Sequence, residues 1–282
     1  ILDLVEKELD FAVGSELISD VPLGGFLSGG VDSPLICYFA SKKSKNRFQT
    51  FTIGSDSNIH DETAKAFNYS KVLNSEHYSN LMTSFNALES LDKSIESVGE
   101  PFGDFSIIPT WQVSKLAKEN VTVVLSGDGA DELFFGYERF QSIMKNYHYW
   151  GFPYIIRYIL RGMDKFFFNE SFVNECLLSD SPGDAHKGLH SRLRDNLLDG
   201  ISSDLSRVKI PNQYKLYDYD KPKDKNELLS YIRKAEFYGM LQKTLKKVDR
   251  ASMAHGLEVR LPFLDTRIID FSNLYINLLS HN

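Results

Sequence analysis

The sequence predicts an α/β fold, built on a parallel sheet with helices around it and an appended, mainly helical subdomain. In the first half of the chain, short apolar runs alternate with helix-length amphipathic segments, which indicates strand-helix-strand crossovers. Two glycine-rich loops follow such apolar runs directly. Over residues 137–241 the strand signal fades and helix-length segments dominate, including the aromatic segment 147–168.

The first segments of the chain establish this order. Residues 1–18 carry apolar side chains at helical spacing and are predicted to form an amphipathic helix. Residues 21–27 form a short apolar run that ends in the first glycine loop. Ser33 followed by Pro34 suits an N-cap with proline at the first helical position. We therefore expect a strand, a glycine loop and a helix in succession.

The following segments repeat the pattern. Residues 48–53 are typical of a buried strand, and a helix is expected to begin at residues 61–62. Its inner face is expected to consist of apolar side chains: Ala64, Phe67 and Val72. A helix predicted over residues 110–119 leads to residues 121–125, the most strand-like run of the chain.

Composition limits the classes of function. Hydrophobic residues make up 42% and charged residues 25% of the 282 residues, as in ordinary globular proteins. The net charge of -6 gives no broad basic surface for nucleic acid or anionic lipid, and no stretch approaches the length of a membrane span. Cys37 and Cys176 are too few and too far apart for a disulfide framework or a Cys-rich zinc site. We expect a cytoplasmic protein without nucleic-acid or membrane partners.

The first glycine loop, residues 28–33, follows an apolar strand and precedes a helix. Its two glycines let backbone amides surround an anion, and the helix N-terminus adds partial positive charge, so a phosphate suits this loop. Asp32 would repel a bare phosphate, and its presence is explained if it holds a divalent cation beside the phosphates. From this loop alone, an ordinary glycine turn with an aspartate near the helix start is an equally good interpretation.

The second glycine loop, residues 126–132, also leaves the C-terminal end of a predicted strand, where open parallel sheets bind ligands. It places three carboxylates, those of Asp128, Asp131 and Glu132, within five residues. Leucines flank the loop on both sides. A metal or substrate site is therefore favoured over a solvated turn.

A basic face is predicted on a helix near the C-terminal end of the chain. Lys243, Lys247 and Arg250 follow helical spacing, opposite three apolar residues. On geometry alone, a solvated basic face is the favoured interpretation. Three isolated histidines lack the clustered ligands of a zinc site and are assigned to the core or the surface: His60, His77 and His255.

Five short segments, in their order along the chain, resemble the asparagine synthetase family. Each motif alone is weak, but five in sequence are highly specific. They are residues 19–24, 28–33, 99–102, 125–132 with 136–137, and 247–254 with 258–265. The resemblance covers residues 19–140 and 245–275 well, and the intervening stretch only loosely.

The resemblance implies an adenine-nucleotide α-hydrolase-like core of the HUP or PP-loop type that uses ATP and Mg²⁺. The residues implied to hold the pyrophosphate end of ATP are Ser28, Gly29, Gly30, Asp32 and Ser33. Those implied to border the adenosine are Phe26 or Leu27, Ile53, Ser126 and Gly127. The implied Mg²⁺ ligands are Asp32 and Asp131, and the implied catalytic residues are Asp128, Lys247 and Arg250. Lys243 is still expected to lie on a solvated basic face. Glu258, Arg260 and Asp265 are expected to form a structural ion-pair network behind the site.

The implied activity is ATP-dependent amidation of a carboxylate through an acyl-adenylate, with aspartate converted to asparagine and AMP and pyrophosphate released. Ammonia would come from glutamine through a glutaminase domain of the same polypeptide. The resemblance also makes a homodimer a candidate assembly. We expect an ATP-binding core over residues 1–140, a helical subdomain over 141–240 and a helical return over 241–282 that completes the ATP site. The chain is expected to be a fragment without the N-terminal glutaminase domain and the C-terminal tail, able to bind nucleotide but turning over poorly.

Pro34 departs from the family pattern, which usually has a serine there. Proline has no N–H to donate, so a lower affinity for ATP is expected. Two alternatives stay open: the same adenylation of another acceptor, as in relatives that amidate a sugar acid or close a β-lactam ring, and a noncatalytic nucleotide-binding module. The ATP loops do not separate the first from aspartate amidation, whereas Asp32 and Asp131 argue against the second because it predicts eroded metal carboxylates.

Overall fold

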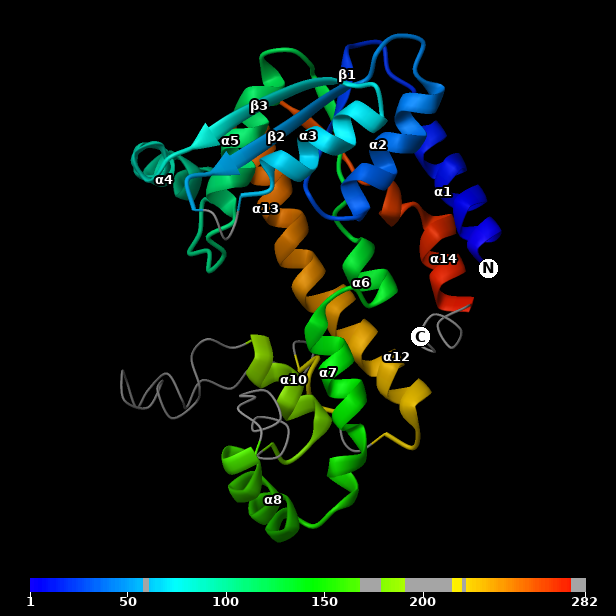
Figure 1. The fold of residues 1–282 in the computed structure, drawn as a ribbon, viewed down its shortest axis with the longest axis vertical. Coiled ribbons are helices and arrows are strands. Elements are labelled where there is room, and N and C mark those ends of the chain that lie inside the picture. Colours follow the sequence, from blue (N-terminus) through cyan, green and yellow to red (C-terminus); the bar gives the residue numbers. More distant parts are fainter. Residues whose placement is uncertain (58–60, 168–178, 191–214, 220–221, 275–282) are drawn as a thin grey trace. The chain divides into compact units, whose positions relative to one another are not determined.

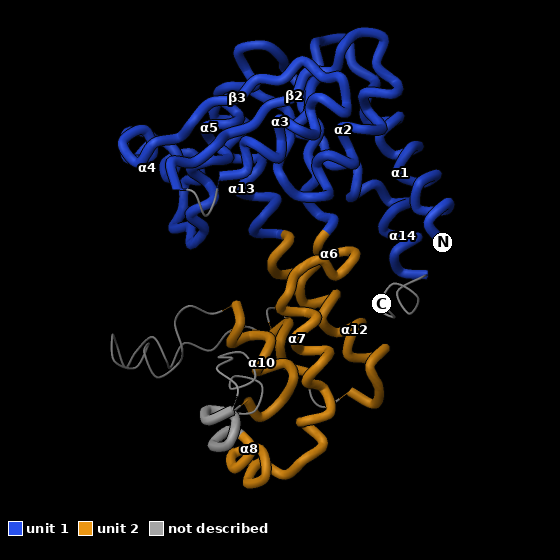
Figure 2. Tube along the Cα trace, viewed as in Figure 1, with its two compact units in different colours: residues 1–130, 242–274 blue, residues 131–241, 275–282 orange. Residues whose placement is uncertain are grey.

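The computed structural model describes residues 1–57, 61–167, 179–190, 215–219 and 222–274 (Figure 1). The chain divides into two compact units (Figure 2). The first unit comprises residues 1–130 and 242–274, and the second contains residues 131–241. Among the described residues, no helix combines the length and the apolar character needed to cross a membrane.

A five-stranded sheet forms the centre of the first unit, in the order β3-β2-β1-β4-β5. Its strands are β1 (Leu23–Phe26), β2 (Gln49–Ser55), β3 (Glu76–Met82), β4 (Val123–Leu125) and β5 (Glu258–Arg260). All four strand pairings are parallel, which confirms the predicted α/β class. The chain runs outward from β1 to β3 and then returns to the other side of β1, so the strand order reverses between β1 and β4.

Helices cover both faces of this sheet. They are α1 (Leu2–Glu16), α2 (Asp32–Lys43), α3 (Thr63–Val72), α4 (Ser84–Val98), α5 (Ile107–Lys118), α13 (Leu241–Met253) and α14 (Thr266–Leu274). Successive strand residues point to opposite faces, and a Cβ on Gly25 would meet Cys37 of α2, whereas one on Gly24 would meet Phe51. Phe51 packs with Ala117 of α5. The sheet therefore lies between α2 and α5, as expected when right-handed crossovers change direction.

The start of α2 differs from the prediction that Ser33 caps the helix. Val31 occupies the N-cap position and Asp32 is the first helical residue. The Ser33 hydroxyl instead accepts a hydrogen bond from the Ser28 amide, at 2.8 Å, and so serves the preceding loop. Pro34 lies in the first turn, where a backbone amide would have no intrahelical partner, and is therefore tolerated.

The predicted inner face of α3 is wrong. Its buried residues are Ala66 and Ser70, whereas Phe67 is 51% and Val72 83% exposed. Small side chains let α3 approach β2 and β3 closely, and the ring of Phe67 lies 4.2 Å from the Lys71 ammonium instead. Ala64, also predicted to face inward, is exposed.

In the second unit, all regular elements of the described residues are helical. They are α7 (Glu138–Asn146), α8 (Tyr154–Phe167), α10 (Pro182–His190), α12 (Lys225–Ala235) and the π-helix η3 (Glu236–Met240), with α6 (Ala130–Phe134) at the boundary and the short 3₁₀ helix η1 (Tyr147–Gly151). Phe140, Ile143 and Ile232 belong to its core, which confirms a helical subdomain. The boundaries predicted at residues 140 and 240 remain predictions.

Candidate functional site

The strand order places a candidate site at the carboxyl ends of β1 and β4. In open parallel sheets, ligands bind outside these ends at the point where the strand order reverses. The loop over residues 27–31 leaves β1, and the loop over residues 126–129 leaves β4. The topology therefore brings both glycine loops to the reversal point, although about a hundred residues separate them in the sequence.

The first glycine loop is organised around two serine hydroxyls. The Ser28 amide donates to Ser33 Oγ at 2.8 Å, and the two hydroxyl oxygens lie 2.9 Å apart. The Gly30 amide donates to Ser28 Oγ at 3.2 Å. Ser33 lies in the first turn of α2 and is buried, so its hydrogen bond with Ser28 fixes the loop against that helix. The amides of Ser28 and Gly30 thus have hydrogen-bond acceptors within the loop and the first turn of α2.

The Gly29 amide donates to a carboxylate oxygen, Glu62 Oε2, at 2.8 Å. An anionic oxygen is therefore already bound at the loop, in the manner expected for a phosphate oxygen. A Cβ on Gly29 would lie 3.0 Å from the Cβ of Glu62 and 3.1 Å from that of Lys65, so this close approach favours glycine. Glu62 was not among the predicted site residues, because this contact joins residues from different parts of the chain.

The second glycine loop packs directly against the first. A Cβ on Gly127 would lie 2.7 Å from the backbone nitrogen of Ser33, so only a glycine allows this approach. The Ser126 amide donates to the Arg260 carbonyl at 2.9 Å, and Ser126 Oγ donates to Asp128 Oδ2 at 2.6 Å. The structure thus brings the first loop, with Ser28, Asp32 and Ser33, against the second loop, with Ser126, Gly127 and Asp128.

The acidic residues occupy different positions. Asp32 is half-buried at the first position of α2, and Asp131 lies on α6 in the second unit. Carboxylate oxygens at a phosphate-binding loop are the donors that suit Mg²⁺, so Asp32 fits the implied ion. That Asp32 and Asp131 share a metal remains a prediction. Glu132 is buried and accepts a hydrogen bond from the Tyr137 hydroxyl at 2.9 Å, and burial together with this carboxylate raises the pKa of Tyr137.

Three of the residues implied to border the adenosine, Phe26, Leu27 and Ile53, lie on or directly after β1 and β2. The Leu27 amide donates to the Phe51 carbonyl at 2.9 Å, and the Thr52 hydroxyl donates to the Leu27 carbonyl. The Leu27 backbone is therefore engaged with β2. Ile53 lies within β2 and is half-buried, and Phe26 ends β1. Their contact with a nucleotide remains a prediction.

The basic residues of α13 divide between two environments. Lys243 forms an ion pair with Asp104 at 3.2 Å, so it is not simply solvated as predicted. Burial raises the pKa of Asp104, but hydrogen bonds from Ser106 and the charge of Lys243 outweigh it, and the pKa lies below its usual value. Arg250 is exposed, 3.8 Å from neighbouring Asp249. The catalytic roles of Lys247 and Arg250 remain predictions.

The expected ion-pair network behind the site forms in part. Arg260 pairs with Glu258 at 2.6 Å and also donates to the backbone carbonyls of Glu16 and Ile18, at 2.6 and 2.8 Å. Asp265 instead accepts a hydrogen bond from the Arg267 amide at 2.8 Å, at the start of α14. Arg260 therefore fastens the end of α1 to β5.

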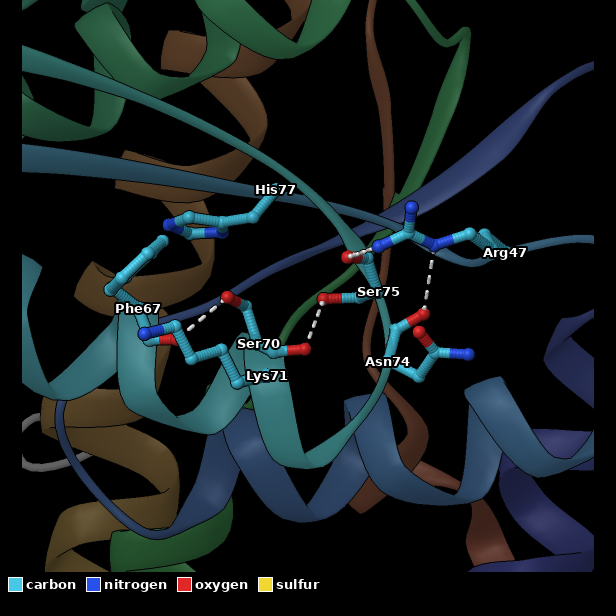
Figure 3. Close-up of a pocket in the computed structure, with 7 residues that line it drawn as sticks. All are labelled: Arg47, Phe67, Ser70, Lys71, Asn74, Ser75 and His77. Carbon is cyan, nitrogen blue, oxygen red and sulfur yellow. Dashed lines mark hydrogen bonds between the residues drawn. The ribbon is translucent and has the colours of Figure 1, made fainter.

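A separate pocket of about 360 Å³ lies at the opposite edge of the sheet, near the amino ends of β2 and β3 (Figure 3). Arg47 donates to the carbonyls of Asn74 and Ser75, at 3.2 and 2.9 Å. His77 Nδ1 lies 3.0 Å from Thr50 Oγ1, and burial lowers the pKa of His77. His255 packs edge-on against Trp111, and His60 lies outside the described residues. The pocket is not part of the two-loop site.

Comparisons with known proteins point to one family. A family model described as asparagine synthase matches residues 4–273. The chain is 30% identical over 281 residues to the glutamine-hydrolyzing asparagine synthetase 1 of Bacillus subtilis (strain 168), covering 93% of this chain and 42% of that protein. It is 27% identical over 276 residues to a putative glutamine-hydrolyzing asparagine synthetase of Mycobacterium bovis, covering 94% of this chain and 41% of that protein. It is 25% identical over 277 residues to the human glutamine-hydrolyzing asparagine synthetase, covering 95% of this chain and 34% of that protein. The chain thus spans less than half the length of these relatives.

Proposed function

Because the chain belongs to the asparagine synthase family, we propose that it uses ATP to activate the carboxylate of aspartate for amidation to asparagine. The observation that carries this proposal is the packing of Gly127 against the backbone of Ser33, which joins the phosphate-suited first loop to the acidic second loop at the reversal point of a parallel sheet. The Gly29 amide, bound to a carboxylate oxygen, supports phosphate binding by the first loop.

In the proposed reaction, an oxygen of the substrate carboxylate attacks the α-phosphorus of ATP and pyrophosphate leaves. The first glycine loop and the N-terminus of α2 would hold the leaving pyrophosphate through backbone amides. Asp32 would hold Mg²⁺ beside these phosphates, with Asp131 as the second proposed ligand, and the ion would neutralise the charge that develops on the leaving group.

Ammonia would then attack the carbonyl carbon of the acyl-adenylate, and AMP would leave as the amide forms. Asp128 is proposed to lie close to this carbonyl and to accept a proton from the attacking nitrogen. Its carboxylate is oriented by the Ser126 hydroxyl, at 2.6 Å. Lys247 and Arg250 are proposed to face the nucleotide or to support the loops that hold it.

The nitrogen source is a further proposal. The relatives are named glutamine-hydrolyzing enzymes, and this chain corresponds to less than half of their length. We infer that ammonia comes from glutamine through a glutaminase domain of the same polypeptide. The reaction itself needs only ammonia, so it can be assayed with added ammonium.

The test is AMP and pyrophosphate formation from ATP by the full polypeptide with ammonium chloride, across aspartate and other candidate carboxylates. Aspartate-dependent AMP formation is expected, and Asp32→Asn should abolish most of it. Asp10→Asn is the matched control, because Asp10 forms an exposed ion pair with Lys43 in the same unit. AMP formation with another acceptor alone would identify a different amidating enzyme, and ATP binding without AMP formation would identify a noncatalytic module.

A further inference from the structure

Three potential metal ligands meet inside the second unit. His186 and His190 lie one turn apart on α10, and Glu236 is the first residue of the π-helix that follows α12. Glu236 Oε1 lies 2.6 Å from His186 Nε2 and 2.5 Å from His190 Nε2, and the two nitrogens are 3.3 Å apart. Two imidazole nitrogens and one carboxylate oxygen therefore point at one small volume.

Local structure explains why these side chains converge. Residues i and i+4 share one face of a helix, so both imidazoles project from α10 in the same direction. The first turn of α10 is fixed by the Ser181 hydroxyl, which accepts from the Asp184 amide at 3.0 Å. Glu236 is presented by a π-helical turn, a feature that often occurs at functional sites.

The environment of the cluster is unusual for an acid. Glu236 and His186 are fully buried, and a buried carboxylate is costly unless cations or donors compensate it. Arg139 binds Glu236 Oε2 at 2.8 Å, which leaves Oε1 directed at the two imidazoles. The side chains of His186, His190 and Arg139 therefore surround this buried carboxylate.

We propose that His186, His190 and Glu236 form a zinc site that fastens α10 to the end of α12. Two histidines and one glutamate are an established zinc ligand set that leaves a fourth position for water or another ligand. Nitrogen and carboxylate donors together favour Zn²⁺ over Mg²⁺ and Ca²⁺, which prefer oxygen alone.

The geometry accommodates the ion with a small movement. Tetrahedral ligands about 2.05 Å from zinc lie about 3.3 Å from each other. The 3.3 Å separation of the two imidazole nitrogens meets this requirement, whereas Glu236 Oε1 must withdraw by about 0.8 Å to reach the same spacing. A rotation of the carboxylate about its hydrogen bond to Arg139 supplies a movement of this size.

The groups around the cluster can form the hydrogen bonds that orient zinc-binding histidines. Zinc-bound histidines donate their other ring N–H to a hydrogen-bond acceptor. His186 Nδ1 lies 3.0 Å from the Tyr219 hydroxyl, which can accept this bond. Without a metal, the same side chains form a hydrogen-bonded network, which is the competing account.

The experiment measures Zn²⁺ binding by the full chain, without a polyhistidine tag, after treatment with EDTA. Competition with a chromophoric chelator gives stoichiometry and affinity, and Co²⁺ substitution reports tetrahedral coordination through its visible absorption. One ion per chain is expected, with affinity reduced at least 100-fold in His190→Gln and about 10-fold in Tyr219→Phe, because outer-shell changes cost about 10–100-fold. His148→Gln is the matched control and should bind as the wild type does, because His148 belongs to the same unit and its ring contacts Tyr149 in a tilted arrangement.

A wild-type chain that binds no stoichiometric Zn²⁺, or a His190→Gln variant that binds it as tightly, would overturn the proposal in favour of the metal-free network. Glu236→Gln is a less suitable variant because its side chain is fully buried, whereas the side chain of His190 is 16% exposed. The readout is metal binding, so neither result depends on whether the chain uses ATP.

Discussion

Replacing Gly127 by alanine tests whether the contact between the two glycine loops matters for nucleotide use. The new Cβ would lie 2.7 Å from Ser33 N, 2.9 Å from Asp32 C and 3.0 Å from Ser33 Cα. All three are backbone atoms at the start of α2, so no side-chain rotation relieves the overlap. An ordinary contact begins at 3.4 Å, so the loops must separate by about 0.7 Å.

This separation predicts the size of the effect. A misplacement of about 1 Å can reduce an enzymatic rate about 100-fold, so we expect kcat/KM for ATP to fall about 10-fold to 100-fold in Gly127→Ala. That loss corresponds to about 1.4 to 2.7 kcal/mol of transition-state stabilisation. The free energy of unfolding should fall by about 1 to 3 kcal/mol, as for other overpacked positions.

The assay is AMP release at varied ATP concentration, with the affinity for Mg-ATP measured by calorimetry and unfolding followed in urea. Gly103→Ala is the matched control, because a Cβ there meets no atom within 4 Å. It should retain activity and affinity within about twofold. Near-normal ATP affinity and AMP release in a folded Gly127→Ala variant would show that the loop contact does not position the nucleotide.

Three further predictions concern single side chains. Asp32→Asn and Asp131→Asn should each remove most AMP formation at saturating Mg²⁺ without lowering the melting temperature. If the two carboxylates share a metal, the double variant should be little less active than either single variant, and additive losses would contradict this. Glu62→Gln should lower KM for ATP about two- to fivefold, because it removes a negative charge that competes with phosphate for the Gly29 amide. An unchanged or raised KM would count against phosphate binding by the Gly29 amide. Burial raises the pKa of Cys37 to about 12, so the unfolded chain releases this proton at lower pH than the folded chain, and stability should fall as pH rises above about 8.5. Between pH 8 and 10 the wild type should lose about 2 kcal/mol more unfolding free energy than Cys37→Ala, measured by urea denaturation, and equal losses would refute the shift.

Several elements could be predicted because their signals are local. Residues 1–18, 48–53 and 121–125 contain α1, much of β2 and β4 within their predicted ranges or close to them. The edge strand β3 gave no such signal, because most of its side chains are exposed and polar residues therefore occupy it. Strand β5 has only three residues, too few to show a period.

In the candidate site, too, the local features could be predicted from the sequence and the long-range contacts could not. Glycine loops are visible in sequence because a close backbone approach requires glycine, and Gly127 shows such an approach in the structure. Glu62 and Glu236 owe their contacts to packing between segments 33 and at least 46 residues apart, which no local pattern encodes. The spacing of His186 and His190 was a usable signal, since i and i+4 histidines on a helix are typical of zinc sites.

The discontinuity of the first unit affects how the protein can fold during synthesis. Strand β5 pairs with β4, but the ribosome makes β5 only after more than a hundred further residues. At about 5–20 residues per second, the β4 edge has no β5 partner for about 7 to 27 s. An unpaired strand edge invites association with other chains, so the nascent protein passes through a period in which chaperones would protect it.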